Sequence, residues 1–188
     1  MNTALEIRLL TQLDPVDIKR VASGYISDGK YVVEYTDSDR YTALNLRFVQ
    51  LDQPYRKVND HFDDETVQRY AQTLHHAYSF GAFDNNLLVG ILISEPQHWN
   101  QSVWVWEFHV AETHRRLGIG RRLMDTVAEK AKFAGLRTIV CETQTTNVPA
   151  IQAYRKLGFR LEGADISYYS NADYPDGEIA VFMKRRLA

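Results

Sequence analysis

Cysteine, long apolar runs and excess positive charge are all scarce in this chain, and each absence narrows the range of functions. Cys141 is the only cysteine, so an intramolecular disulfide and a cysteine-based metal site are both excluded. No apolar run approaches the roughly 18 residues that a membrane helix needs. Charged residues interrupt the apolar stretch at 1–15, so we expect no signal peptide. The sequence therefore predicts a cytoplasmic protein with no membrane partner.

The formal net charge is only −2 at pH 7 in a chain of 188 residues. Non-specific nucleic-acid binding needs a surplus of lysine and arginine, so we expect no nucleic-acid partner. Hydrophobic residues make up 45% of the chain and charged residues 24%, which is typical of a globular protein with a buried core. The length fits a single domain, 1–188, and no internal repeat or low-complexity linker divides it.

The histidines form no metal-binding motif. No H-x-E or H-x-x-x-H pattern and no cysteine partner accompanies them, so we expect no metal. The six are His61, His75, His76, His98, His109 and His114.

The apolar periodicity predicts an α/β fold in which helices pack on a mixed sheet. Strands and helices alternate in the second half of the chain, and Asp84–Asn86 supply the turn of a hairpin over 79–96. The other predicted strands cover 4–11, 30–35, 42–51, 102–110, 137–143, 159–170 and 178–186. The predicted helices cover 15–23, 63–79, 121–135 and 148–157.

A basic glycine turn, "HRRLGIGRR" at 114–122, lies between the strand at 102–110 and the helix that follows. Gly118 and Gly120 have no Cβ, so a ligand can approach the backbone N–H groups. These groups and the positive end of the helix dipole point the same way and suit an anion. The R-x-x-G-x-G pattern is equally typical of a plain turn, and it matches neither the P-loop nor the dinucleotide fingerprint.

A second motif, N-x-x-A-x-x-x-Y-x-x-x-G-F, covers 147–159, about thirty residues after the glycine turn. With the two motifs in this order and spacing, the stretch 102–188 resembles the GNAT family of acetyl-CoA-dependent N-acetyltransferases. Within that family it is most similar to streptothricin acetyltransferases, which share the E-T-Q, G-x-D-x-x-x-Y-S-N and E-I-A-x-F patterns found here after position 141. The resemblance implies a central mixed, mostly antiparallel sheet with helices on both faces and acetyl-CoA as cosubstrate.

The resemblance also implies which residues bind acetyl-CoA. The backbone of the glycine turn would hold the pyrophosphate, and side chains of the turn would add charge or form only a solvated basic face. The strand before the turn would pair with the pantetheine arm through main-chain atoms, and the N–H of Val110 would stabilise the oxyanion. Asn147 would bind the pantetheine amides or only cap its helix, and Ala150 would let that helix approach closely. The full set is Phe108, His109, Val110, Arg115, Arg116, Leu117, Gly118, Ile119, Gly120, Arg121, Asn147, Ala150 and Tyr154.

Three residues are candidates for catalysis. Tyr154 matches the family's tyrosine beside the CoA sulfur, where a phenol can protonate the leaving thiolate; otherwise it is a helix tyrosine packed on the sheet. Glu107 is slightly favoured as general base, because alternation separates it from the aromatic Trp106 and Phe108. Glu142 is the candidate for orienting or binding the substrate. A structural carboxylate is an equally good interpretation of each glutamate.

The segment 165–178 gathers acidic and aromatic residues. It is typical of a polar hairpin loop, and in the family it lies near the acceptor side, where such groups suit a cationic amine. We therefore expect acetyl transfer to a primary amine of a small molecule, most specifically a streptothricin-type antibiotic. Another small amine, a protein amine and a non-catalytic acetyl-CoA-binding module are the alternatives. The oligomeric state stays open, with a homodimer as one option.

Overall fold

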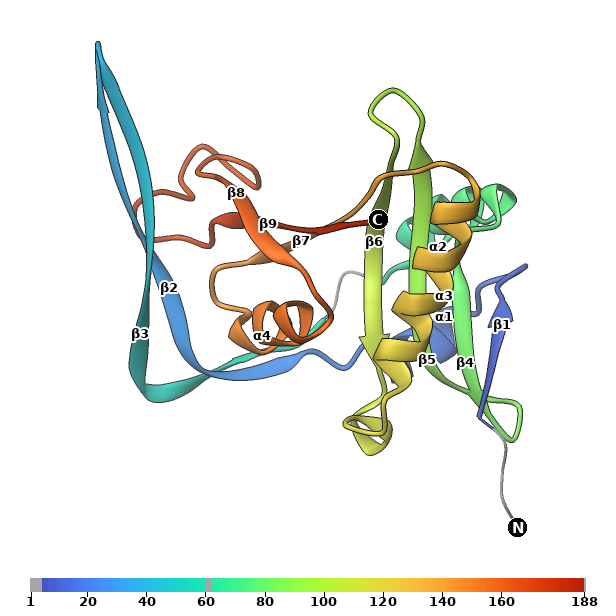
Figure 1. Cartoon of the computed structure of the whole chain (residues 1–188). Helices are drawn as coiled ribbons and strands as arrows, with labels where there is room; N and C mark the ends of the chain where they lie inside the picture. Colours follow the sequence, from blue (N-terminus) through green and yellow to red (C-terminus); the bar gives the residue numbers. More distant parts are fainter. Residues whose placement is uncertain (1–4, 60–61, 188) are drawn as a thin grey trace. The chain divides into compact units, whose positions relative to one another are not determined.

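The computed structural model describes residues 5–59 and 62–187, so His61 and the first residue of the strand predicted at 4–11 lie outside the described residues. The chain forms two compact units (Figure 1). The first unit comprises Met1–Gly24, Val58–Val140 and Arg185–Ala188, and the second comprises Tyr25–Lys57 and Cys141–Lys184. A single acetyltransferase domain over 1–188 stays a prediction.

The first unit is built on an antiparallel sheet with strand order β1–β4–β5–β6. These strands are β1 (Glu6–Leu9), β4 (Phe80–Asp84), β5 (Leu87–Gln97) and β6 (Ser102–Val110). The helical elements are α1 (Pro15–Val21), α2 (Asp64–Thr73), the 3-10 turns Leu74–His76 and Glu112–His114, and α3 (Ile119–Phe133). Strand β7 (Thr138–Gln144) begins in this unit and continues into the second.

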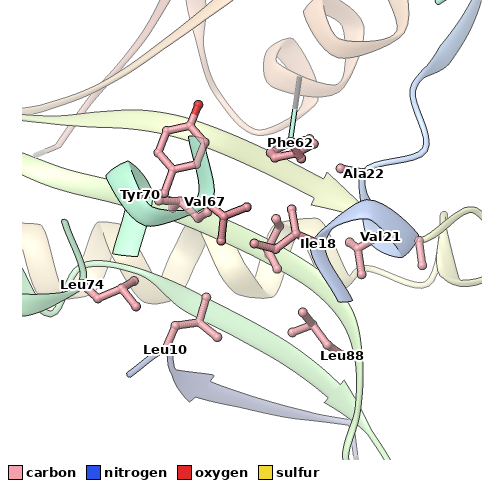
Figure 2. Packing of buried hydrophobic residues seen from close by; sticks show 12 residues of the cluster. Leu10, Ile18, Val21, Ala22, Phe62, Val67, Tyr70, Leu74 and Leu88 are labelled. Carbon is pink, nitrogen blue, oxygen red and sulfur yellow. The ribbon is translucent and has the colours of Figure 1, made fainter. Parts of the chain in front are cut away.

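Helices cover both faces of the first unit's sheet, as predicted. On one face, a Cβ placed on Gly90 of β5 would meet Ile119 and Leu123 of α3. On the other face, Ile91 and Ile93 join a buried cluster with residues of α1 and α2 (Figure 2). That cluster consists of Leu10, Ile18, Val21, Ala22, Phe62, Val67, Tyr70, Leu74, Leu88, Ile91, Ile93 and Ala111.

The hairpin β4–β5 confirms the turn predicted at Asp84–Asn86. Asn85 and Asn86 have φ values of 48° and 65°, which is the left-handed conformation that a two-residue hairpin turn requires. The helix predicted over 63–79 is shorter than expected. It ends at Thr73, and one 3-10 turn follows before Ala77 adopts a left-handed φ of 60°.

A β-bulge interrupts the pairing of β5 with β6. Ile93 lies opposite Glu107 whereas Ser94 lies opposite Val105, so Trp106 is the extra residue. Paired residues share a face of the sheet, which places Val105 on the α3 side and Glu107 on the α1 and α2 side. Simple alternation would have put both of them on one face. The bulge therefore determines which face receives the side chains at the end of β6.

The second unit contains a two-stranded hairpin, β2 (Tyr25–Ser38) with β3 (Tyr41–Lys57). Both strands are longer than the predicted 30–35 and 42–51. The unit also holds the end of β7, helix α4 (Val148–Lys156), and the antiparallel pair β8 (Arg160–Asp165) and β9 (Ala180–Arg186), with β9 beside β7. The strand predicted over 159–170 ends at Asp165. None of the helices in the described part of the chain is long and apolar enough to cross a membrane.

Candidate active site

The N-terminus of α3 differs from those of the other three α-helices because no side chain among residues 5–59 and 62–187 caps it. Asp14, Asp63 and Asn147 each accept a hydrogen bond from a backbone N–H in the first turn of α1, α2 and α4. Helix α3 begins instead after Gly118, which has no side chain to offer. Since the first N–H groups of a helix have no intrahelical partner, those at the start of α3 can donate hydrogen bonds to an anionic ligand.

The turn before α3 keeps its backbone open. Arg116 and Gly118 have left-handed φ values of 66° and 78°, and a Cβ on Gly118 would meet nothing within 4 Å. Leu117 between them is 67% exposed, so its side chain does not cover the turn. The sequence predicted an anion site here, and the geometry provides the exposed backbone that such a site requires.

The side chain of Arg115 stabilises this turn through hydrogen bonds to neighbouring backbone carbonyl oxygens. Its guanidinium donates hydrogen bonds to the carbonyl oxygens of Val110 and Gly24, each at 3.1 Å. A longer contact of 3.5 Å reaches the hydroxyl of Ser23. This side chain therefore ties the end of β6 to the segment after α1. Its charge is engaged by backbone oxygens, whereas a role of its main chain in cofactor binding stays a prediction.

Gly120 allows α3 to lie directly against the end of β6. A Cβ at this position would come within 3.0 Å of Cζ of Phe108 and 3.8 Å of Cγ2 of Val110. Even the smallest side chain would therefore press against the Phe108 ring, which would have to shift by a few tenths of an ångström. The first unit thus brings Phe108 and Val110 next to Gly120, whereas His109 between them faces the side of α1 and α2. Whether they bind pantetheine stays a prediction.

Glu107 is the centre of a hydrogen-bonded group of three side chains. Its Oε1 accepts a hydrogen bond from the Tyr70 hydroxyl at 2.7 Å, and its Oε2 lies 2.6 Å from Nε2 of His109. The Glu107 side chain is 9% exposed and that of His109 is 22% exposed. The ring of Phe62 packs edge-on against the imidazole, with centroids 5.9 Å apart. Burial, followed by the negative charge of Glu107, raises the pKa of Tyr70, which therefore remains a donor at neutral pH.

Sequence reasoning missed Tyr70 because it occupies an apolar position of a helix and looked like core. It does belong to the buried cluster, and its hydroxyl stands at the rim of that cluster, turned away from the neighbouring apolar side chains (Figure 2). A tyrosine in such a stripe carries a polar atom that needs a partner once it is buried. This need for a hydrogen bond is the feature of the sequence from which a polar partner for Tyr70 could have been predicted.

In the second unit, α4 places Asn147, Ala150 and Tyr154 as its pattern predicted. The Oδ1 of Asn147 accepts a hydrogen bond of 3.2 Å from the N–H of Ala150, so this residue does cap the helix. Tyr154 is 7% exposed, and its ring lies 5.4 Å from that of Phe159. Its hydroxyl hydrogen-bonds the buried thiol of Cys141, whose pKa is raised by burial. The roles of Asn147, Ala150 and Tyr154 toward acetyl-CoA stay predictions.

Glu142 also has a tyrosine partner. The hydroxyl of Tyr169 donates to Oε1 of Glu142 and accepts a 3.1 Å hydrogen bond from Nε2 of Gln144. Burial and the Glu142 charge raise the pKa of Tyr169, which keeps its proton. Tyr168 packs beside this pair, with its ring 5.3 Å from that of Tyr169. Together they form an acidic and aromatic surface that is suited to an ammonium group.

Two of the acidic residues in the segment 165–178 have structural partners instead of facing an acceptor. Asp173 is 5% exposed and accepts hydrogen bonds from the N–H of Tyr169 at 2.8 Å and the hydroxyl of Ser170 at 2.6 Å. Glu178 forms an ion pair with Lys57 and accepts from Thr146 at 2.6 Å. Burial alone would raise the pKa of Glu178, but these hydrogen bonds outweigh burial and lower it.

Within residues 5–59 and 62–187, no three His, Cys, Asp or Glu side chains gather as metal ligands would. The candidate residues fall into one group in each unit. The first unit holds Glu107, Phe108, His109, Val110 and the turn 115–121, and the second holds Glu142, Asn147, Ala150 and Tyr154.

Comparison with known proteins adds a family to this geometry. The sequence profile of the acetyltransferase (GNAT) family matches residues 45–159, so the likeness begins well before position 102. A streptothricin acetyltransferase of Escherichia coli is 33% identical over 147 residues, which is 77% of this chain and 76% of that protein. The crystal structure of nourseothricin acetyltransferase has a TM-score of 0.78 and 29% identity, covering 99% of this chain and 100% of that one. A Bacillus anthracis protein in complex with acetyl coenzyme A has a TM-score of 0.72 at 22% identity, covering 97% and 99% of the two chains, and shows the same fold.

Proposed function

Because the chain belongs to the acetyltransferase (GNAT) family and is thus an acetyl-CoA-dependent N-acetyltransferase, we propose that it acetylates a primary amine of a streptothricin-class antibiotic. The identity of 33% to a streptothricin acetyltransferase over most of both chains supports this substrate class. A single buried cysteine, Cys141, is in keeping with the reducing cytoplasm, where we place the reaction.

The observation that supports binding of the acetyl donor, acetyl-CoA, is the uncapped N-terminus of α3. Its backbone N–H groups, from about Arg116 to Arg121, would hold the pyrophosphate of acetyl-CoA against the positive end of the helix dipole. The residues present fit such a group, because Gly118 leaves the backbone open and no side chain in the described part of the chain caps the helix. Acetyl-CoA supplies an activated acetyl thioester when it is bound.

The chain's own residues would then assist transfer of the acetyl group. The N–H of Val110 would donate a hydrogen bond to the oxygen on which negative charge develops. The Tyr154 hydroxyl would give a proton to the departing sulfur, and the family motif around it supports this role. Asn147 and Ala150 would position the pantetheine arm, Asn147 with the part of its amide that does not cap α4.

For the acceptor, we propose that the surface formed by Glu142, Tyr168 and Tyr169 attracts a cationic amine. The two tyrosine rings are about 42–43% exposed, so they are accessible to a ligand. Streptothricin-type compounds carry several amines on a flexible β-lysine arm, and aromatic faces beside a carboxylate bind ammonium groups well. The internally bonded Asp173 and Glu178 have no part in this proposal.

Free-thiol release tests the proposal directly. The protein is incubated with acetyl-CoA and a panel of amines that includes streptothricin, a polyamine, an amino sugar and a peptide N-terminus. We expect thiol release with streptothricin, a mass increase of one acetyl group on the antibiotic, and resistance in cells that express the protein. Release with only neutral amines or the peptide would refute the antibiotic substrate and leave the acetyltransferase activity standing.

A further inference from the structure

The arrangement of Tyr70, Glu107 and His109 suits a general base that a neighbouring carboxylate holds in place. We propose that His109, and not Glu107, takes the proton from the acceptor amine, and that Glu107 is a positioning residue that holds the imidazole in place. The inference rests on the proposed amine acetylation and holds whichever amine is the acceptor. All three side chains belong to the first unit.

Glu107 is poorly suited to accept the substrate's proton because both of its oxygens already have partners. Oε1 accepts from Tyr70 at 2.7 Å and Oε2 lies 2.6 Å from His109. Each oxygen keeps a second lone pair, but protonation would remove the negative charge that strengthens both of these buried hydrogen bonds. The Glu107 side chain is also only 9% exposed, less than half the 22% of His109.

The same contacts prepare His109 for the role. The Glu107 carboxylate is an acceptor only, so Nε2 carries the hydrogen and Nδ1 presents its lone pair. Phe62 packs edge-on against the ring at an interplanar angle of 82°, which restricts its rotation. Among residues 5–59 and 62–187, the imidazole lies near Glu107 of β6, Phe62 before α2, Ile91 opposite it on β5 and, through Glu107, Tyr70 of α2. A partly exposed imidazole oriented by a buried carboxylate is a recurrent general base in enzymes.

The place of His109 in the strand suits this chemistry. It directly precedes Val110, whose N–H is the proposed oxyanion donor, and successive residues of a strand are only about 3.3 Å apart along its axis. As the amine nitrogen bonds to the acetyl carbonyl carbon, Nδ1 of His109 takes the proton that this nitrogen loses. The electron pair of the broken C–S bond leaves on sulfur, which is then protonated. Proton and electrons balance without any further reactant.

Variants of the two residues separate their roles. We expect His109→Gln to lower kcat by about 10²- to 10⁴-fold, the range of a lost general base, and to remove the acidic limb of the kcat–pH profile. Glu107→Gln should cost less, because a glutamine oxygen can still accept from Nε2 and keep the ring oriented. Exogenous imidazole should restore part of the activity of His109→Ala but none of Glu107→Gln. The matched control is His98→Gln, an exposed histidine of the β5–β6 connection, which should behave like wild type.

Two measurements do not depend on turnover. The affinity for acetyl-CoA, measured by calorimetry, should be unchanged in His109→Gln, and the ¹⁵N shifts of the imidazole should show the hydrogen on Nε2. Wild-type kcat in His109→Gln, a larger loss in Glu107→Gln than in His109→Gln, or a hydrogen on Nδ1 would each overturn the inference. Loss of activity without imidazole rescue and with an unchanged pH profile would also overturn it, since that outcome indicates a structural role. If the wild type acetylates none of the amines, the proposed function fails and the inference with it.

Discussion

At the scale of single residues, a substitution of Tyr154 tests whether the α4 motif has the catalytic role that we propose. Its hydroxyl hydrogen-bonds a thiol that burial keeps protonated, and sulfur is a weak hydrogen-bond partner. Removing the hydroxyl should therefore cost little stability. We expect Tyr154→Phe to lower kcat by about ten- to a thousandfold, with little change in Tm or in the dissociation constant of acetyl-CoA.

A neighbouring tyrosine provides the matched control for this change. The hydroxyl of Tyr31 accepts a 2.9 Å hydrogen bond from Arg155 of α4, so Tyr31→Phe removes a contact to the same helix from a residue with no proposed part in the reaction. Steady-state kinetics and melting curves of the two variants are then compared. Equal kcat values would assign Tyr154 to packing.

The sequence predicted the types of residue at the site better than their partners. The glycine turn, the asparagine cap and the tyrosine of α4 follow from local patterns, since each depends on residues close by in the chain. Tyr70 reaches Glu107 across 37 positions of sequence. Likewise Lys57 and Glu178 are 121 positions apart, so the ion pair that engages one of the acids in the predicted acceptor segment cannot be found from spacing alone. Tertiary packing decides such pairs.

At the scale of elements, the uncapped start of α3 predicts how the pyrophosphate site can be closed. A carboxylate at position 118 would interact favourably with the helix N-terminus but repel a diphosphate. Aspartate and asparagine both tolerate the left-handed backbone there. We therefore expect Gly118→Asp to weaken acetyl-CoA binding by about tenfold or more, which corresponds to about 1.4 kcal/mol, while Tm without ligand stays near the wild-type value.

Gly118→Asn is the uncharged control of the same shape, and it should keep more of the affinity than Gly118→Asp because it adds no negative charge. Calorimetric titration with acetyl-CoA measures both variants. Equal affinity for the Asp and Asn variants would refute the pyrophosphate assignment. Position 120 is less informative, because a side chain there meets Phe108 and disturbs the contact between helix and strand as well as the ligand.

Among the elements, α1, α3, α4, β6, β7 and β9 lie within a few residues of their predicted positions, whereas the length of the β2–β3 hairpin and the irregular features were not predicted. The helix predicted at 63–79 breaks where a 3-10 turn and a left-handed Ala77 follow it. The bulge at Trp106 leaves no mark in the pattern, since "SVWVWEFHV" reads as uninterrupted alternation. Bulges depend on the partner strand, and the partner is known only after folding.

At the scale of the whole molecule, the charge balance predicts a response to salt. The formal net charge is slightly negative, and Glu142 lies beside exposed tyrosines that are suited to a cation. Attraction of a polycationic acceptor to such a surface weakens once the Debye length shrinks from about 10 Å at 0.1 M salt to about 3 Å at 1 M. We expect KM for streptothricin to rise several-fold over this range while kcat changes little.

The matched variants here are Glu142→Gln and Asp173→Asn. The first should raise KM at low salt and flatten its salt dependence, whereas the second removes an internal hydrogen-bond acceptor and should lower Tm instead. Initial rates at several ionic strengths provide the measurement. A wild-type KM that does not change with ionic strength would count against a cationic acceptor at this surface.

The extra residue at Trp106 also bears on how such a site can arise. Before it, odd-numbered side chains of β6 face α3; after it, odd-numbered side chains face α1 and α2. The bulge therefore exchanges the faces on which odd- and even-numbered side chains of β6 lie, much as an inserted letter shifts a reading frame. If β6 kept its length but paired with β5 without the bulge, Leu92 would lie opposite Glu107, and Glu107 and His109 would both move to the face of α3. A substitution that favours regular pairing at Trp106 could therefore displace both side chains from the site, although neither residue had been replaced.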